Sequence, residues 1–554
     1  MSLRGLMYAT VMCRKLLNHA LAAALVYATT PYSFAGDVIT DGTIGTTPST
    51  IVVLGDTIPD TYDIIESLGE RSGTNLFHSF LTFNIDSGEI ARFSEDVLGT
   101  TSNVISRVTG GTGSLINGTI SNIPSANFWF VDTAGVMIGA DATFDVSGAL
   151  SIGSVDYIDF GGPRYYALPS NQVDAISTLT VNPADFGFLT GTSAGNLTIA
   201  SLTLDDTGTG AGLEIGDIML AGNAVTITDA TIVNDPEASG SDITISAPGN
   251  LTLDSTTLGT VTENNAAGNI TLSGGSVALI DGTEITSTAS GVSGSAVDPV
   301  PGPLNLGSVG KSGDITIIGA TGVTANIVGG VPGPGLTPVT ISSTSNNVDS
   351  NGAGSVSIEA TVGNVFLSGT SIASTTLTDL AGGTPGAISI SASGGLTLDD
   401  VDLDTSSTSA TDAGTIQLSG FDVSLNNGTQ LNARGESAGS GTAGDIDIKA
   451  TNRVLVNVDP ISLLPTAGAS VLIDTSAAGA SNGGSDLTMI GGDVLLSNFN
   501  VNASNNSTAV SPDVGMVSIT AIGGGTTAGA LAIENSFLNG DSSSSGSAPG
   551  MLLS

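Results

Sequence analysis

The sequence predicts an all-β fold, a right-handed parallel β-helix that occupies residues from about 40 to 540. Three observations support this prediction. Short segments alternate apolar and polar residues, they return in groups at a recurring interval, and glycine is abundant (76 residues) whereas aromatic residues make up only 4%. Alternation with a period of two turns one face of each strand inward. Three such strands per turn, stacked in register, would bury their apolar rows between neighbouring coils.

The repeating unit consists of a glycine, one or two small or polar residues, and an apolar–polar–apolar triplet. Successive units begin 27, 45, 41, 32, 28, 30, 41 and 30 residues apart. Their first residues are Asp242, Asn269, Asp314, Ser355, Ala387, Thr415, Asp445, Asp486 and Met516. A second triplet usually follows, and a third follows in places, as from Val401 to Leu403. A hairpin meander shows the same alternation, but the grouping of strands and the scarcity of Asn-Gly turns favour stacked coils.

The intervals also predict the length of the rod and its insertions. At ~22 residues per coil and ~4.8 Å of rise, the mature chain would form a rod on the order of 110 Å long. The intervals of 41 and 45 residues predict loops that leave one side of the coil, among them the Gly/Pro-rich stretches 297–306 and 328–339.

The first 35 residues have the pattern of a secretory signal. Arg4, Arg14 and Lys15 precede an apolar stretch, and small residues allow cleavage after Ala35. The apolar stretch is shorter than the roughly 20 residues of a membrane-spanning helix, so a membrane anchor is the less favoured alternative. Cleavage removes Cys13, the one cysteine of the chain. The mature chain is therefore expected to lack disulfides, thiol catalysis and cysteine-bound metals.

The charge balance limits the partners of the mature chain. Three of the 11 Lys and Arg residues lie in the signal, which leaves eight basic residues against 51 Asp and Glu. Such a negative field repels nucleic acid and anionic lipid surfaces. We therefore expect no nucleic-acid partner and no stable membrane insertion.

Five segments near the N-terminus match, in the same order, those of a known family. They are residues 73–85, 83–93, 103–111, 116–120 and 144–148. Together they resemble the N-terminal secretion domain of the filamentous haemagglutinin family, the exported partner of bacterial two-partner secretion (TPS). Family members usually carry Asn-Pro-Asn-Gly-Ile where this chain has Asp132-Thr-Ala-Gly-Val136. Asp132 and Gly135 can still form a turn, although a looser one.

The resemblance implies an exported adhesin- or haemagglutinin-like protein, secreted or held at the surface of a Gram-negative-type bacterium. A separate outer-membrane barrel transporter would recognise its N-terminal domain, and its surface or matrix target, carbohydrate or protein, is left open. The predicted organisation is a signal peptide (1–35), a secretion domain that caps the rod (36–165), β-helical repeats (166–540) and a disordered or truncated tail (541–554).

Twelve residues of the matching segments are the candidate functional residues, either for transporter recognition or only for holding the N-terminal coils together. They are Asn75, Phe77, Phe80, Phe83, Asn84, Asn103, Arg107, Gly110, Gly111, Asn117, Asp132 and Gly135. The four asparagines can satisfy backbone groups at coil corners or bond a strand of the transporter. An even spacing predicts that Phe77 and Phe83 share a strand face, with Phe80 opposite unless a bulge intervenes. Arg107, one of eight basic residues, is expected to have an acidic partner.

A secreted polysaccharide-active enzyme on the same fold is the alternative function. A lyase needs a basic residue near clustered acids, and Arg434, Lys449 and Arg453 lie within about one coil of one another. No acidic cluster recurs beside them, so isolated surface charges are favoured. His78 is expected to be a packed residue of the motif, and the segment 483–493 resembles a calcium repeat but occurs once. We therefore predict no catalytic residue, no cofactor and no metal site.

Overall fold

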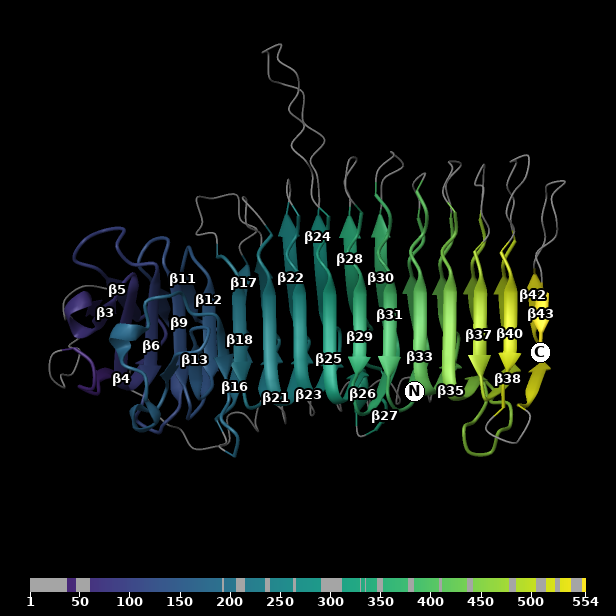
Figure 1. The fold of residues 1–554 in the computed structure, drawn as a ribbon, viewed down its shortest axis with the longest axis horizontal. Coiled ribbons are helices and arrows are strands. Elements are labelled where there is room, and N and C mark those ends of the chain that lie inside the picture. The colour runs from purple at the N-terminus through teal and green to yellow at the C-terminus, as the bar shows by residue number, and fades with distance from the viewer. Residues whose placement is uncertain are drawn as a thin grey trace, which may run out of the picture.

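The protein is a straight stack of β-coils (Figure 1). The computed structural model describes residues 37–45, 60–191, 194–205, 215–234, 240–262, 266–289, 311–328, 330–333, 335–345, 352–376, 383–407, 411–435, 442–477, 485–504, 515–523, 529–539 and 551–554. The signal peptide, the cleavage site at Ala35 and the insertion 297–306 lie outside them. Within these ranges the only helical turns are the 3-10 turns η1 (Glu66–Leu68), η2 (Pro169–Asn171) and η3 (Ile176–Thr178).

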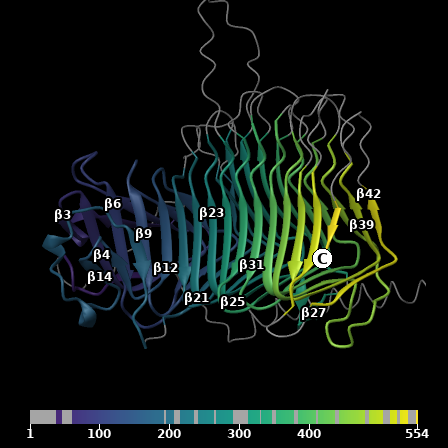
Figure 2. The same cartoon turned by 45° about the vertical axis from the view of Figure 1, so that its right-hand side comes forward.

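Each coil has three parallel strands, one on each face of the stack, as the predicted β-helix requires (Figure 2). The first face consists of β4 (Asn75–Ile85), β6 (Asn103–Val108), β9 (Asn127–Asp132), β12 (Leu150–Ser154), β18 (Ile218–Gly222), β21 (Ile243–Asp254), β23 (Ile270–Ile280), β25 (Ile315–Ala325), β29 (Val356–Ala360), β31 (Ile388–Ala392), β33 (Ile416–Asn426), β35 (Ile446–Val456), β37 (Leu487–Gly491), β40 (Val517–Ala521) and β43 (Met551–Leu553). The long strands among these bend around a corner and continue on the second face.

The second face is completed by separate strands. They are β7 (Ser114–Ile116), β10 (Val136–Ile138), β16 (Leu197–Ala200), β19 (Val225–Thr228), β30 (Asn364–Thr376), β32 (Leu396–Asp404), β38 (Asp493–Ser497) and β41 (Leu531–Glu534). The third face takes the ends of β30 and β32 together with β2 (Thr61–Ile65), β5 (Ile90–Ser94), β8 (Thr119–Ser121), β11 (Thr143–Asp145), β17 (Thr203–Asp205), β20 (Thr231–Asn234), β22 (Thr257–Thr262), β24 (Glu284–Ala289), β28 (Val339–Ser345), β34 (Gln430–Asn432), β36 (Val471–Asp474), β39 (Phe499–Asn502) and β42 (Phe537–Asn539).

The register of the repeats is the one that the triplets predict. The first apolar residue of each triplet pairs with its counterpart in the next coil, in the column Ile243, Ile270, Ile315, Val356, Ile388, Ile416, Ile446, Leu487 and Val517. These side chains are buried in one core that runs the length of the stack. Burial of the same apolar position in every coil explains why alternation alone was enough to find the register.

The predicted rod length was wrong because the coils are longer than assumed. Consecutive first-face strands lie 25 residues apart from Ile218 to Ile243 and 45 apart from Ile270 to Ile315. A spacing of 22 occurs between Phe128 and Leu150 in the N-terminal coils. The first face has fifteen described strands, so at about 4.8 Å per coil the stack is roughly 70 Å long.

Glycines form a column at the corner between the third face and the next first face. A Cβ at any of them would overlap a backbone atom of the adjoining coil, as at Gly240, Gly268, Gly313, Gly354, Gly386, Gly414, Gly444 and Gly515. This close approach is the reason why each repeating unit begins with glycine.

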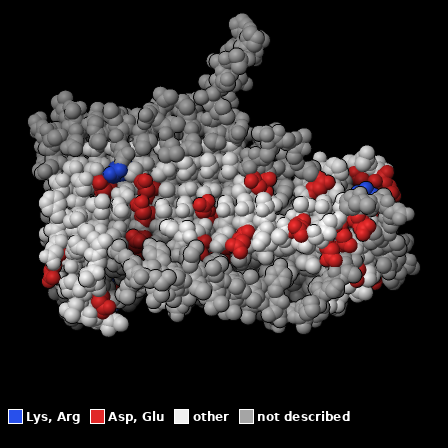
Figure 3. Space-filling model, turned by 180° about the vertical axis from the view of Figure 1, so that it is seen from behind, with Lys and Arg blue, Asp and Glu red and all other residues white. Residues whose placement is uncertain are grey.

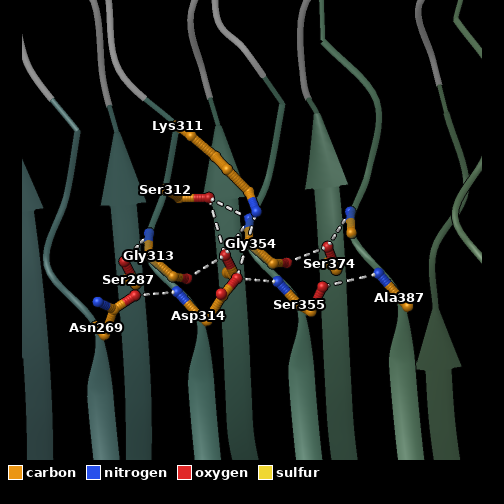
Figure 4. Close-up of polar contacts among 12 residues, drawn as sticks. Asn269, Ser287, Lys311, Ser312, Gly313, Asp314, Gly354, Ser355, Ser374 and Ala387 are labelled. Carbon is orange, nitrogen blue, oxygen red and sulfur yellow. Dashed lines mark hydrogen bonds and ion pairs between the residues drawn. The ribbon is translucent and has the colours of Figure 1, made fainter.

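Serine and Asx side chains join the coils beside these glycines (Figure 4). The Ser374 hydroxyl donates to the Gly354 carbonyl (2.7 Å) and accepts from the Gly386 N–H (2.7 Å). On the outer side, a carboxylate oxygen of Asp314 accepts from the Ser355 N–H (2.8 Å). Each coil therefore satisfies backbone groups of its neighbour that a corner would otherwise leave without partners.

The corner between the second and third faces holds one residue per coil with a positive φ, from 41° to 58°. The residues are Ser201, Asp229, Ser255, Asp281, Asn326, Gly369, Asp400, Asn427, Asn457, Asn498 and Asn535. Asn, Asp and Gly tolerate this left-handed conformation best, which explains the residue types at this corner.

Two long intervals place insertions at this same corner. The antiparallel hairpin of β26 (Ile327–Val328) and β27 (Val331–Pro332) lies in the predicted insertion 328–339. A second loop covers residues 457–470, where Val458 bridges Pro465. Of the predicted tail, Met551–Leu553 form β43, which pairs with β40, so this part of the tail is a strand.

The N-terminal end of the stack is covered, as predicted for a cap. The outer edge of β4 pairs antiparallel with β3 (Glu70–Ser72) and with β1 (Asp37–Thr40). These strands occupy edge groups that could otherwise pair with another chain. The division between cap and repeats at residue 165 stays a prediction.

Candidate functional site

The N-terminal coils differ from the rest of the stack because a side layer covers the outside of their first face. This layer contains β13 (Tyr157–Asp159), β14 (Arg164–Tyr166) and β15 (Asp185–Gly187), which form a small antiparallel sheet. A second hydrophobic cluster joins the layer to the coils and includes Phe77, Ile105, Trp129, Tyr165 and Phe186. The candidate residues lie in and around this junction.

The three candidate phenylalanines are fully buried, but the predicted sharing of a face was wrong. Phe80 and Phe83 lie in the core inside the coils, with ring centroids 5.1 Å apart. Phe77 points outward into the second cluster, 5.0 Å from the Tyr165 ring. The strand turns the corner between Phe80, which pairs with Val108, and Asn84, which pairs with Leu115. This corner shifts the alternation, as the bulge alternative allowed.

Asn75 and Asn103 belong to a buried amide ladder. The Asn103 side-chain NH2 donates to the Asn75 amide oxygen (2.7 Å), and that of Asn127 donates to the Asn103 oxygen (2.8 Å). The Asn75 NH2 group donates to the carbonyls of Leu179 (2.8 Å) and Val181 (2.7 Å) in the side layer. The ladder therefore joins three coils and attaches the side layer to the first of them.

Asn127 was not among the candidates. It follows Asn75 and Asn103 by intervals of 24 and 28 residues that match one coil. An asparagine repeated at the coil interval is the sequence signal that could have found it.

Arg107 is buried at the other end of the junction. Its guanidinium donates to the Ser79 hydroxyl (2.9 Å), the Tyr166 carbonyl (2.9 Å) and the Thr43 hydroxyl (3.1 Å), and it lies over the Tyr165 ring. Among the residues described, no ion pair joins Arg107 to a carboxylate, so the expected acidic partner is not in direct contact.

Asp41 is linked to Arg107 through hydroxyl groups. The Ser79 hydroxyl donates to one Asp41 oxygen (2.7 Å) and the Thr43 hydroxyl to the other (2.8 Å). Burial raises the pKa of Asp41, but hydrogen bonds from Thr43, Ser79 and Thr109 outweigh burial and lower that pKa below its usual value. Arg107 and Asp41 thus form a hydroxyl-bridged charge pair that ties β1 and the side layer to the coils.

Asp132 and Gly135 form the predicted turn. The Asp132 carboxylate accepts from the Ala134 N–H (2.8 Å) and the Ser114 hydroxyl (2.7 Å), and the Gly135 N–H donates to the Asp132 carbonyl (3.3 Å). Gly135 has a φ of 130°, which favours glycine. Burial raises the pKa of Asp132 to about 6 despite these hydrogen bonds.

The remaining candidates lie at coil corners. Asn84 accepts from the Leu115 N–H (3.0 Å), and Asn117 accepts from the Asp141 N–H (3.1 Å). Gly110 and Gly111 are exposed, and a side chain at Gly110 would overlap the Leu81 carbonyl. Of the twelve candidates, only Gly110 and Gly111 are exposed, while Asn117 and Gly135 are half-buried and the other eight are buried.

His78 is a packed residue of the motif, as expected. It is fully buried between the rings of Phe80 and Phe93. Burial lowers the pKa of His78 to about 4, against the opposing effects of the Leu68 carbonyl and Glu66. The imidazole is therefore neutral at physiological pH.

The basic residues of the enzyme alternative do not form one cluster. Lys449 and Arg453 flank a corner between the first and second faces and pair with Asp447 (3.0 Å) and Asp422 (2.9 Å). Arg434 lies at the end of the third face, 3.8 Å from Asp474. The expectation that the three could share a face was wrong, because 15 residues cover two of the three faces of a coil rather than a whole turn.

Acidic residues spread along the stack, with few basic ones beside them (Figure 3). Across the described ranges, no group of three or more His, Cys, Asp or Glu side chains is placed to hold a metal ion. The same part of the chain contains no helix long and apolar enough to cross a membrane. The calcium-like segment 483–493 lies partly outside the description.

The fold and its covered N-terminal coils define a β-helical exported protein with an N-terminal secretion domain. The family model of the TPS secretion domain matches residues 37–317, and the chain belongs to this family. It is therefore an exoprotein of two-partner secretion, a class secreted by Gram-negative bacteria, generally non-enzymatic and recognised by an outer-membrane transporter.

Comparison with solved structures found the crystal structure of the HMW1 secretion domain from Haemophilus influenzae. It is 13% identical, with a TM-score of 0.35, over 85% of this chain and 96% of that one. Comparison with curated proteins gave no match.

Proposed function

We propose that this protein is an adhesin-like exoprotein whose β-helical rod presents loops to a surface or matrix target. A separate outer-membrane barrel transporter carries it by recognising the N-terminal coils. Family membership supports the export step, and the architecture of the repeats supports the presentation of loops.

The observation that carries the adhesive role is the independence of the coil corner from the length of chain inserted there. Three residues, 263–265, separate β22 from the next described residue, whereas 21 residues, 290–310, follow β24. The paired strands on both sides keep their register in each case. The glycine and serine columns close this corner, so the inserted sequence is free to vary. A scaffold that tolerates loops of any length suits a protein whose target is bound by loops.

Attachment of the purified mature chain tests the adhesive role. Beads coated with the protein are expected to attach to host or neighbour cells more than beads coated with an unrelated acidic protein of similar charge. Replacing residues 290–310 by the three-residue segment 263–265 should keep the fold, measured by circular dichroism, and reduce attachment if this insertion contributes. Parental beads that attach no better than the control would contradict the adhesive role.

For the transporter, we propose that the candidate residues divide by exposure. Folded secretion domain offers Gly110, Gly111, Asn117 and Gly135 at or near its surface, whereas Asn75 and Arg107 act by holding the side layer. Asn75→Ala would leave the Leu179 and Val181 carbonyls without their donor, a cost of about 1–3 kcal/mol for each buried group.

Export with a co-expressed transporter distinguishes the two groups. Asn117→Ala should lower export while the fluorescence of the single tryptophan, Trp129, still reports a folded domain. Asn75→Ala and Arg107→Ala should lower export and the stability of the domain together. Parental export of Asn117→Ala would remove the case for recognition at that corner, and parental export of unstable Asn75→Ala would show that the side layer is not needed.

A further inference from the structure

Aromatic and basic side chains, both rare in the repeats, meet at one corner of the stack. Residues 195–554 contain only four aromatic residues, all phenylalanine, and four basic residues. Phe421 lies at the corner within β33, and Lys449 and Arg453 lie on β35 in the next coil. Their meeting at one corner sets this place apart from the Ser, Thr and Asn surface around it.

The corner contains a shallow hollow of about 370 Å³. Its wall includes Ala392, Ser393, Ser419, Phe421, Lys449 and Thr451, from three consecutive coils. The preceding coil turns this corner with Gly394 and Gly395, which have no side chains to fill the space. The Phe421 N–H donates to the Gly394 carbonyl (2.8 Å), and the Phe421 side chain stays 51% exposed.

The charges beside the ring are already balanced. Lys449 pairs with Asp447 (3.0 Å). Arg453 pairs with Asp422 (2.9 Å), which also accepts from the Asn452 side chain (2.8 Å). The whole chain has a formal net charge of −40. An anionic ligand would therefore meet a repulsive field with no free cation to offset it.

We propose that this hollow, the Phe421 corner, is a binding subsite for a neutral saccharide residue. The exposed ring offers a flat apolar face on which the C–H face of a pyranose can stack. The hydroxyls of Ser393, Ser419 and Thr451 and the Lys449–Asp447 pair surround it with donors and acceptors for sugar hydroxyls. An apolar platform with a few convergent polar groups is the general character of small-ligand sites. The proposal rests on the adhesive role proposed above and names a ligand class for it.

Binding of the full mature chain to defined oligosaccharides tests the proposal. The probes are cellohexaose, maltohexaose and mannohexaose as neutral arms and an oligogalacturonate as the acidic arm, followed by saturation-transfer NMR and titration. We expect at least one neutral arm to bind and the acidic arm not to bind. Phe421→Ala should weaken that binding at least about tenfold, which corresponds to 1.4 kcal/mol, whereas Phe421→Trp should retain it.

Phe537→Ala is the matched control, because Phe537 is also an exposed phenylalanine of the repeats, 65% exposed, on a different face. Its binding should equal that of the parent. Ser393→Tyr, which fills the hollow and leaves Phe421 in place, gives a second route should Phe421→Ala fail to fold. Parental affinity of a folded Phe421→Ala or Ser393→Tyr, equal binding of the acidic arm, or no neutral binding would each overturn the proposal. Cell attachment that persists in these variants would leave the adhesive role standing without this subsite.

Discussion

Asp132 and His78 are buried titratable side chains of the N-terminal coils, and each is more stable in its neutral form. In Asp132 the folded-state pKa of about 6 lies above the model value of 3.8, so its contribution to stability is present at low pH and is lost as pH rises through about 6. In His78 the folded-state pKa of about 4 lies below 6.5, so its contribution is present above pH 6.5 and is lost as pH falls through about 4.

Asp132→Asn is therefore expected to stabilise the N-terminal coils above pH 6. An asparagine oxygen can still accept from the Ala134 N–H, and the carboxylate charge is removed. The gain at pH 8 should approach about 3 kcal/mol and should vanish near pH 4, where the parental carboxyl is protonated in the folded state. Urea unfolding followed by Trp129 fluorescence at the two pH values measures the difference. A gain of the same size at both pH values would contradict a buried ionised carboxylate.

His78→Phe is expected to remove acid sensitivity from the same coils. The neutral ring keeps the contacts with Phe80 and Phe93 but binds no proton on unfolding. Between pH 7 and pH 4 the parent should lose about 3 kcal/mol through this histidine, and the variant should not. The slope of unfolding free energy against pH, from the same fluorescence, is the readout, because the substitution also changes packing and hence absolute stability. Identical slopes would show that His78 is already charged or solvated.

At the scale of the coil, two corners carry most of the sequence specificity. The glycine column needs the absence of a Cβ, whereas the corner between the second and third faces needs a residue that tolerates positive φ. These are separate constraints, and each has a matched control within the chain.

Gly354→Ala is expected to destabilise the repeats, because the new Cβ would overlap the Gly313 carbonyl in the next coil. Overpacking of this kind costs about 1–3 kcal/mol. Gly395→Ala is the control, since its Cβ would meet nothing closer than the Asn364 side chain at 3.8 Å. Thermal unfolding by circular dichroism should place Gly354→Ala below the parent and Gly395→Ala near it. Equal melting of the two variants would contradict a backbone clash.

Asn427→Val tests the second corner, where Asn427 has a φ of 51°. A β-branched residue in this conformation should cost about 1–2 kcal/mol more than glycine. Asn427→Gly loses the same side-chain bond to Asp399 but keeps the conformation, so the difference between the two variants isolates the backbone effect. If valine and glycine unfold at the same urea concentration, this corner does not select for positive φ.

The regular part of the molecule was predictable because one physical requirement recurs in every coil. Burial of the same apolar position identified the column from Ile243 to Val517 residue by residue. The N-terminal site was predictable only in part. Motifs located Asn75, Asn103 and Arg107, but their partners at residues 165–181 are far along the chain and carry no periodic signal. The change of face between Phe77 and Phe80 depends on a corner that alternation alone does not reveal.

For the whole molecule, the account claims that the covered N-terminal coils carry the information for export and that the repeats are cargo. The charge of the chain fits this division, because a field of the same sign along the stack keeps separate rods apart. The claim concerns a segment rather than a residue, so a deletion tests it best.

The most direct measurement compares export of the full chain with export of a chain that keeps the signal at 1–35 and lacks residues 37–190. Both are expressed with an outer-membrane two-partner transporter, and the fraction outside the cell is measured by immunoblot of medium and intact cells. The full chain is expected outside, and the shortened chain is expected in the periplasm. Export of the shortened chain at the parental level would contradict the claim that these coils are the export signal.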